Sequence, residues 1–118
     1  MSRLQDLLYI KFLRKTENNY YFECNINKKH PVFSGHFPDF PIVPGVCLIN
    51  ATKRAVSQIV GKEVSFLKIR ECKFLSSINP TENTLFMLEF TLSEENEIKA
   101  GIFLNETQCM KLKVTVSY

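Results

Sequence analysis

Long hydrophobic runs are absent from this sequence of 118 residues, whose longest apolar stretches span four or five residues, such as Val46 to Ile49. A membrane-spanning helix needs about 20 consecutive apolar residues, so we expect no membrane span. The first six residues contain no apolar stretch of the kind that marks a signal peptide, and we expect none.

Concentrated charge is also absent. The net charge is +3, and the chain has neither a basic tail nor a block of like charges. A mild positive charge would suit an acidic partner, but it is too weak to indicate nucleic-acid binding, which we do not expect.

Metal-binding and redox cysteine motifs are missing, because the chain contains no C-x-x-C pair and no cluster of cysteine and histidine. The four cysteines lie far apart inside apolar stretches, at Cys24, Cys47, Cys72 and Cys109. We therefore interpret them as buried, reduced thiols that act as small hydrophobic residues. Such thiols are typical of the cytoplasm, where we expect the protein.

The sequence shows no internal repeat, low-complexity segment or long linker, which predicts a single domain over residues 1–118. Its 45% apolar content is enough for one hydrophobic core. Residues 20–26 alternate between apolar and polar side chains, which is typical of a half-buried strand. We expect strands over residues 7–12, 20–26, 64–75, 85–92, 98–104 and 109–118. Turns are expected at Asn18-Asn19 and at residues 79–83, 94–96 and 105–106.

One helix is predicted over residues 45–60, where Leu48, Ala51, Ala55 and Ile59 recur at spacings of three and four. Its first two turns are apolar almost all round, so we expect the helix to begin deeply buried. Its polar residues share one side, namely Asn50, Lys53, Arg54 and Ser57. A single apolar helix among consecutive strands predicts an α+β hotdog fold, a curved antiparallel sheet wrapped around one long central helix.

A proline-rich loop over residues 30–45 precedes this helix and holds four of the five prolines. Proline fixes φ and lacks an N–H group, so the loop can be neither helix interior nor central strand. We interpret this stiff, aromatic segment as one that holds a functional group in place.

The segment GHFPDFPIVPGV, residues 35–46, closely resembles the G-H-F-P-x-x-P-I-x-P-G-V signature of β-hydroxyacyl-acyl-carrier-protein dehydratases. Residues 73–80, KFLSSINP, look like a second segment of that family. The resemblance implies a hotdog dehydratase whose substrate is a thioester on the phosphopantetheine arm of an acyl carrier protein. It implies no other cofactor, no metal and an active site at a dimer interface.

By this resemblance, His36 is the catalytic acid/base, and the family places a glutamate or aspartate fourteen residues later. Here that position is Asn50, and the helix continues to Arg54 where the family usually has glutamine. Gly45 takes the role of the N–H that binds the thioester carbonyl, with Val46 as its neighbour. The aromatic residues expected to line an acyl tunnel are Phe37 and Phe40.

Asn50 cannot ionise, and the loss of one general acid costs about 10²–10⁴ in rate. His36 could then carry out both proton transfers while Asn50 orients the hydroxyl. Alternatively, the chain pairs with another hotdog subunit that supplies the carboxylate, for which Arg54 would be a suitable partner. Both homodimer and heterodimer therefore stay open.

Two other functions remain: a non-catalytic hotdog subunit that binds a partner, and a thioesterase, which Asn50 favours less. An enzyme would act in fatty-acid or polyketide/polyene-type biosynthesis. An acidic carrier protein could contact basic residues, at Lys53, Arg54, Lys62, Lys68, Arg70 and Lys73.

Overall fold

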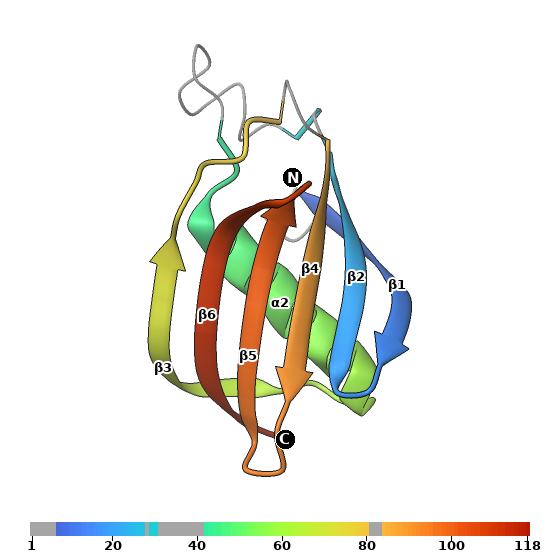
Figure 1. The fold of residues 1–118 in the computed structure, drawn as a ribbon, viewed down its shortest axis with the longest axis vertical. Helices are drawn as coiled ribbons and strands as arrows, with labels where there is room; N and C mark the ends of the chain where they lie inside the picture. The colour runs from blue at the N-terminus through green and yellow to red at the C-terminus, as the bar shows by residue number, and fades with distance from the viewer. Residues whose placement is uncertain (1–6, 28, 31–41, 81–83) are drawn as a thin grey trace.

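The computed structural model describes residues 7–27, 29, 30, 42–80 and 84–118, which form one antiparallel sheet and one long helix (Figure 1). The elements are β1 (Leu8–Thr16), β2 (Asn19–Ile26), α2 (Gly45–Val60), β3 (Ser65–Phe74), β4 (Leu85–Leu92), β5 (Glu97–Leu104) and β6 (Thr107–Ser117). The strand order is β1-β2-β4-β5-β6-β3, which leaves β1 and β3 as the two edges.

The helix carries the chain from one side of the sheet to the other. In Figure 1, α2 crosses one face of the sheet diagonally, and β3 follows at the edge opposite β1. Every neighbouring pair of strands is antiparallel. The prediction of a curved antiparallel sheet around one helix is confirmed.

The core lies between the helix and the sheet. The buried side of α2 consists of Cys47, Leu48, Ala51, Thr52, Ala55 and Val56. Alternate residues of the strands face it, and the largest are Phe22, Phe86 and Phe90. The rings of Phe22 and Phe90 stack with their centroids 6.0 Å apart. This burial of alternate residues explains the apolar–polar alternation in the sequence.

The start of α2 differs from the prediction. We expected this end to be deeply buried, but the side chain of Val46 is 61% exposed. Ile42, just before the helix, is exposed too. Among the described residues, the sheet covers one side of the helix, and Val46 lies outside that buried side.

The first hairpin turn is also displaced by one residue. It consists of Glu17 and Asn18, and Asn19 already pairs with Thr16 as the first residue of β2. Glu17 takes the left-handed conformation, with φ of 40°, which brings the two strands together within two residues. The predicted turns at residues 94–96 and 105–106 are present, and Asn96 and Asn105 have positive φ there. Residues 81–83 of the remaining turn lie outside the described residues.

Local hydrogen bonds fix the far end of α2. Gly61 ends the helix in the left-handed conformation, with φ of 79°, and its N–H donates to the carbonyl of Ser57. The Ser57 hydroxyl donates to the carbonyl of Lys53 and accepts from the N–H of Val64, at 2.9 and 3.1 Å. These bonds connect the helix to the segment that enters β3.

All four cysteines are free thiols, and Cys24, Cys47 and Cys109 are buried while Cys72 is half-buried. The prediction of buried thiols is therefore confirmed for Cys24, Cys47 and Cys109, whereas Cys72 is only partly covered. In the part of the chain that the structure describes, no helix is long and apolar enough to cross a membrane.

Candidate functional site

The N-terminus of α2 presents two backbone N–H groups. Pro44 precedes the helix in an extended conformation, with φ of −60° and ψ of 140°, and supplies no side-chain cap. The N–H of Cys47 donates to the Pro44 carbonyl at 3.0 Å. The N–H groups of Gly45 and Val46 have no acceptor among the described residues. Such groups at the positive end of a helix dipole favour an oxygen that carries negative charge.

Gly45 lies directly against the ring of Phe74, the last residue of β3. A Cβ atom at position 45 would lie 2.5 Å from Cζ of Phe74, closer than van der Waals contact allows. Only glycine therefore fits beneath the ring in its present position. The same two residues border a cavity of about 310 Å³, together with Ile42, Leu48 and Leu75. Sequence reasoning did not single out Phe74, although it belongs to the second segment that resembles the dehydratases.

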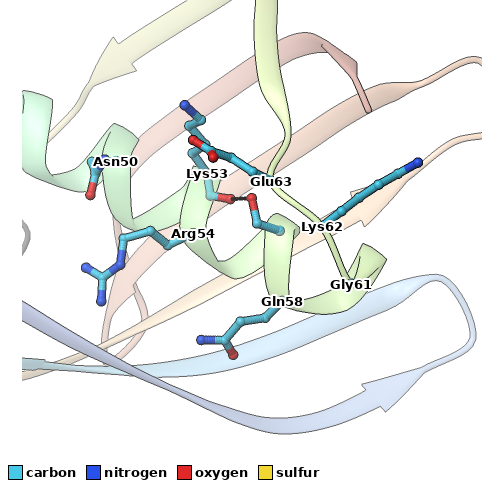
Figure 2. Close-up of a pocket in the computed structure, with 8 residues that line it drawn as sticks. Asn50, Lys53, Arg54, Gln58, Gly61, Lys62 and Glu63 are labelled. Atoms are coloured by element: carbon cyan, nitrogen blue, oxygen red, sulfur yellow. Dashed lines mark hydrogen bonds between the residues drawn. The ribbon is translucent and has the colours of Figure 1, made fainter.

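A second cavity lies on the open side of α2. We name it the α2 groove; its volume is about 580 Å³, and it is lined by Asn50, Lys53, Arg54, Ser57, Gln58 and residues 61–63. In Figure 2, Arg54 and Gln58 project from one side of the helix, and Lys53 lies toward Glu63 on the other. The predicted polar side of the helix is thus confirmed, and it borders this cavity.

Arg54 is held by the first strand. Its Nη1 donates to the carbonyl of Leu8 at 3.1 Å, which connects the middle of α2 to β1. Asn50, one helical turn earlier, is exposed. Arg54 thus attaches the helix to the sheet, in addition to the substrate contact that the sequence predicts for it.

The predicted site residues that the structure describes do not line one common cavity. Gly45 borders the cavity with Phe74, whereas Asn50 and Arg54 line the α2 groove, and Val46 is exposed. The remaining predicted residues, His36, Phe37 and Phe40, lie outside the described residues. The roles assigned to all of these residues therefore stay predictions.

Two basic residues of β3, Arg70 and Lys73, lie close to acidic residues of the sheet. Nε of Arg70 donates to Oγ1 of Thr115 at 3.1 Å and lies 3.9 Å from Glu97. Lys73, Lys111 and Lys113 lie 3.5, 3.8 and 3.8 Å from the carboxylate of Glu71. Desolvation raises the pKa of Glu71, but the three lysines outweigh it and hold that pKa below its usual range.

The family assignment rests on most of the chain. Residues 13–112 match the family described as ApeI-like, ApeI dehydratase. The chain belongs to the ApeI-like dehydratase family. The resemblance to acyl-carrier-protein dehydratases, first noted on residues 35–46, is therefore confirmed at the level of the family.

Curated relatives of this ApeI-like chain include two enzymes named 3-hydroxyacyl-acyl-carrier-protein dehydratase FabZ. The one from Sulfurovum sp. strain NBC37-1 is 34% identical over 77 residues, which cover 54% of this chain and 52% of that protein. The one from Chlamydia muridarum is 32% identical over 77 residues, which cover 58% and 50%. The matched part thus spans about half the length of these relatives.

Solved structures share the fold of this ApeI-like chain. The dehydratase heterocomplex ApeI:P from Xenorhabdus doucetiae has a TM-score of 0.78 at 18% identity, over 92% of this chain and 95% of that one. The dehydratase domain of a mycocerosic acid synthase-like polyketide synthase has a TM-score of 0.69 at 15% identity, over 98% and 40%. At such identities the likeness shows the fold alone.

Proposed function

We propose that this chain is a 3-hydroxyacyl-acyl-carrier-protein dehydratase, or one subunit of such an enzyme, which acts on acyl thioesters. The observation that carries the proposal is the pair of N–H groups at Gly45 and Val46, which have no acceptor among the described residues, in a member of the ApeI-like family. Gly45 also lines a cavity with Phe74. A thioester carbonyl at this point would receive two hydrogen bonds as its oxygen gains negative charge.

Dehydration removes a proton from the α-carbon and expels hydroxide from the β-carbon. The neutral imidazole of His36 takes the α-proton, and the electron pair forms the enolate that Gly45 and Val46 bind. Collapse of the enolate forms the double bond and breaks the β-carbon–oxygen bond. A proton delivered to the departing hydroxide completes a molecule of water.

Asn50 stands where the family places the acid that delivers this proton. Its amide is exposed on the α2 groove and can orient a hydroxyl by donating and accepting hydrogen bonds. It cannot supply a proton at neutral pH. The second transfer therefore falls either to His36 or to a carboxylate from another subunit.

Three observations support a second hotdog subunit as the source of that carboxylate. Residues 40–62 contain no aspartate or glutamate, so α2 offers no acid of its own. Val46 and the edge residues Leu67 and Ile69 of β3 are exposed apolar side chains that another chain could cover. The ApeI:P structure is itself described as a heterocomplex. We propose a heterodimer first and a homodimer second.

The substrate carrier and the pathway follow from the same family membership. The FabZ relatives are named for acyl-carrier-protein substrates, and one similar structure is a polyketide synthase domain. We propose an acyl carrier protein as partner and fatty-acid or polyketide-type chain building as the setting. The four free thiols support a reducing, cytoplasmic compartment.

The test is hydration of an enoyl-acyl-carrier-protein thioester by the purified chain, with His36→Ala as the control. Turnover that is lost in the control supports a dehydratase that is active by itself with Asn50. No turnover above the control overturns the stand-alone enzyme.

A non-catalytic subunit is the second candidate, which the substitution at Asn50 favours. The two candidates differ in what restores activity. We expect a co-purifying hotdog chain that carries the missing carboxylate to give turnover sensitive to His36→Ala in this chain. Turnover of that complex that is unchanged by His36→Ala would make this chain a non-catalytic subunit.

A further inference from the structure

The face of the sheet that points away from α2 carries a cluster of lysines on three neighbouring strands. Lys99 lies between two buried residues of β5, and Lys111 and Lys113 alternate with buried residues of β6. Because successive residues of a strand point to opposite faces, these side chains point away from the core. Lys73 of β3 pairs with Lys111 and shares its face. We name these four residues the outer lysines.

Strand pairing places the outer lysines directly opposite one another. Lys99 is opposite Lys113, and Lys111 is opposite Lys73. Like charges directly opposite on one face destabilise a sheet, whereas opposite charges stabilise it. Lysines often protect the edge of a sheet, but β5 and β6 are interior strands, so edge protection does not explain Lys99 opposite Lys113 (Figure 1).

The acids on this face offset the outer lysines only in part. The single carboxylate of Glu71 lies 3.5 to 3.8 Å from the other three, all except Lys99. Glu97, two residues before Lys99 on β5, lies 3.9 Å from Arg70. Lys99 itself forms no ion pair with any residue that the structure describes. It is therefore held opposite a like charge without an acid beside it.

Gly101 leaves a hollow next to these lysines. It lies opposite Lys111 on one side and opposite Glu89 of β4 on the other. A Cβ atom at position 101 would lie 2.8 Å from the ring of Phe103 and 3.2 Å from Nε2 of Gln108, so these two side chains close one end of the hollow.

The resulting cavity has a volume of about 260 Å³. Its lining includes three outer lysines, Lys99, Lys111 and Lys113, and one acid, Glu89. Gln108 also lines it and adds a neutral N–H donor. A water molecule occupies about 30 Å³ of liquid, so a tetrahedral oxyanion fits with space to spare.

We propose that this cavity binds the phosphate group of a small molecule, held by Lys99, Lys111 and Lys113 above Gly101. A phosphate dianion between these cations would offset their mutual repulsion and accept charge-assisted hydrogen bonds from them. The cavity lies on the face of the sheet opposite α2, and the inference does not depend on the proposed function. Such a phosphate has two sources, free inorganic phosphate and a phosphate monoester.

The experiment titrates inorganic phosphate into the purified chain, with any subunit it retains, at constant pH and constant ionic strength. Backbone amide chemical shifts of the isotope-labelled chain locate the ion and give its affinity. The variants are Lys99→Gln, Glu89→Gln and, as the control, Lys11→Gln. Lys11 is opposite Glu23, which lies between two buried residues of β2, so it shares the outer face but does not line the cavity.

We expect saturable shifts at Gly101 and the residues around it. Lys99→Gln should weaken phosphate binding about fivefold, and Glu89→Gln should strengthen it by a similar factor, which is the scale of an exposed charge pair. Lys11→Gln should change the affinity by less than about twofold. The absence of saturable shifts at the cavity overturns the proposal. Equal weakening in Lys99→Gln and Lys11→Gln also overturns it, because the ion would then follow net charge alone.

The repulsion between Lys99 and Lys113 gives a second measurement. In chloride buffer without phosphate, Lys99→Gln should unfold at a higher urea concentration than the wild-type chain. Saturating phosphate at the same ionic strength should reduce this difference, because the wild-type chain binds the ion more tightly. A difference that phosphate leaves unchanged overturns the proposal.

A second probe separates the two sources of the phosphate. Glycerol phosphate is titrated in the same way as inorganic phosphate. Tighter binding of the ester identifies a phosphorylated metabolite, and tighter binding of inorganic phosphate identifies the free ion; either result supports the cavity if Lys99→Gln weakens it. Binding of polyglutamate to this face without binding of either probe overturns the proposal in favour of a docking surface for an acidic protein.

Discussion

Nη1 of Arg54 donates a hydrogen bond to the carbonyl oxygen of Leu8 at 3.1 Å, although the two residues lie 46 positions apart. Leu8 is 1% exposed, so water reaches it poorly. This one contact joins the middle of α2 to the edge strand β1. It also places a permanent positive charge in the α2 groove beside Asn50.

Removal of this bond should destabilise the chain. Arg54→Ala leaves the Leu8 carbonyl without its donor, and we expect the free energy of unfolding to fall by about 1–3 kcal/mol. Lys53→Ala is the matched control, because Lys53 is the neighbouring cation and has no such bond; it should change stability by less than about 0.5 kcal/mol. Urea unfolding measures both. An equal loss of stability in the two variants would mean that removal of the positive charge, and not of the hydrogen bond to Leu8, causes the destabilisation.

The effect of Gly45→Ala on the free energy of unfolding should change sign when the ring of Phe74 is removed. In the native background Gly45→Ala forces the Phe74 ring to move, and we expect about 1 kcal/mol of destabilisation. In a Phe74→Ala background the same substitution meets no ring and should stabilise α2 by up to about 1 kcal/mol, since alanine favours helices over glycine. A four-protein cycle measured by urea unfolding tests this. Additive effects would show that the ring does not constrain position 45.

Restoring the family's acid should raise activity. Asn50→Glu places a carboxyl group where the dehydratases have one, and a general acid typically contributes about 10²–10⁴ in rate. Asn50→Gln is the matched control, because it has the same length without a titratable group. The measurement is the initial rate of enoyl-thioester hydration. No gain of the glutamate variant over the glutamine variant would remove position 50 from the proton-transfer step.

Alkaline pH should destabilise the fold through Cys24. Burial raises the pKa of this thiol to about 12, although the positive charge of Arg54 acts in the opposite direction, whereas an ordinary thiol titrates at 9.0. The folded chain therefore keeps a proton that the unfolded chain releases, and this contribution to stability is complete below pH 9 and is lost between pH 9 and 12. The predicted loss is about 1.4 kcal/mol per pH unit within that window.

The control for this effect is Cys24→Ala. It should be less stable at neutral pH because it removes a buried sulfur, but its stability should fall less steeply above pH 9. Urea unfolding at pH 8, 9, 10 and 11 gives the two slopes. Parallel slopes would assign the alkaline loss to other groups, such as the tyrosines and lysines.

The sequence predicted the helix better than the strand ends, for a physical reason. Pro44 and Gly61 mark the ends of α2 by local backbone preferences, and its predicted range, 45–60, is the observed one. The strand β1 extends to Thr16 and not to Phe12, because Arg14 to Thr16 pair with β2 on an exposed edge. Apolar periodicity carries no signal for a polar strand segment, although Arg14 and Lys15 lie over the rings of Tyr21 and Tyr20 on β2.

In the candidate site too, local features could be predicted from the sequence, and contacts between distant segments could not. The motif predicted Gly45 and Asn50, and spacing on a helix predicted that Arg54 shares a side with Asn50. The bond from Arg54 to Leu8 and the ring of Phe74 over Gly45 both join segments far apart in the sequence. Exposure of Val46 was mispredicted because apolarity indicates that a residue will be buried, but not whether its own chain or another one buries it.

The strand order has a consequence for the time course of folding. β4, β5 and β6 succeed one another as hairpins, whereas β2 pairs with β4 through Asn25 and Leu85, and β3 pairs with β6 through Ser65 and Ser117. Closing loops between strands so far apart in the sequence costs chain entropy before the new contacts offset that cost. These two pairings should therefore form late and slowly. We expect Phe74 to reach Gly45 only after β3 has joined β6, so the contact between this ring and the start of α2 should form in one of the last steps of folding.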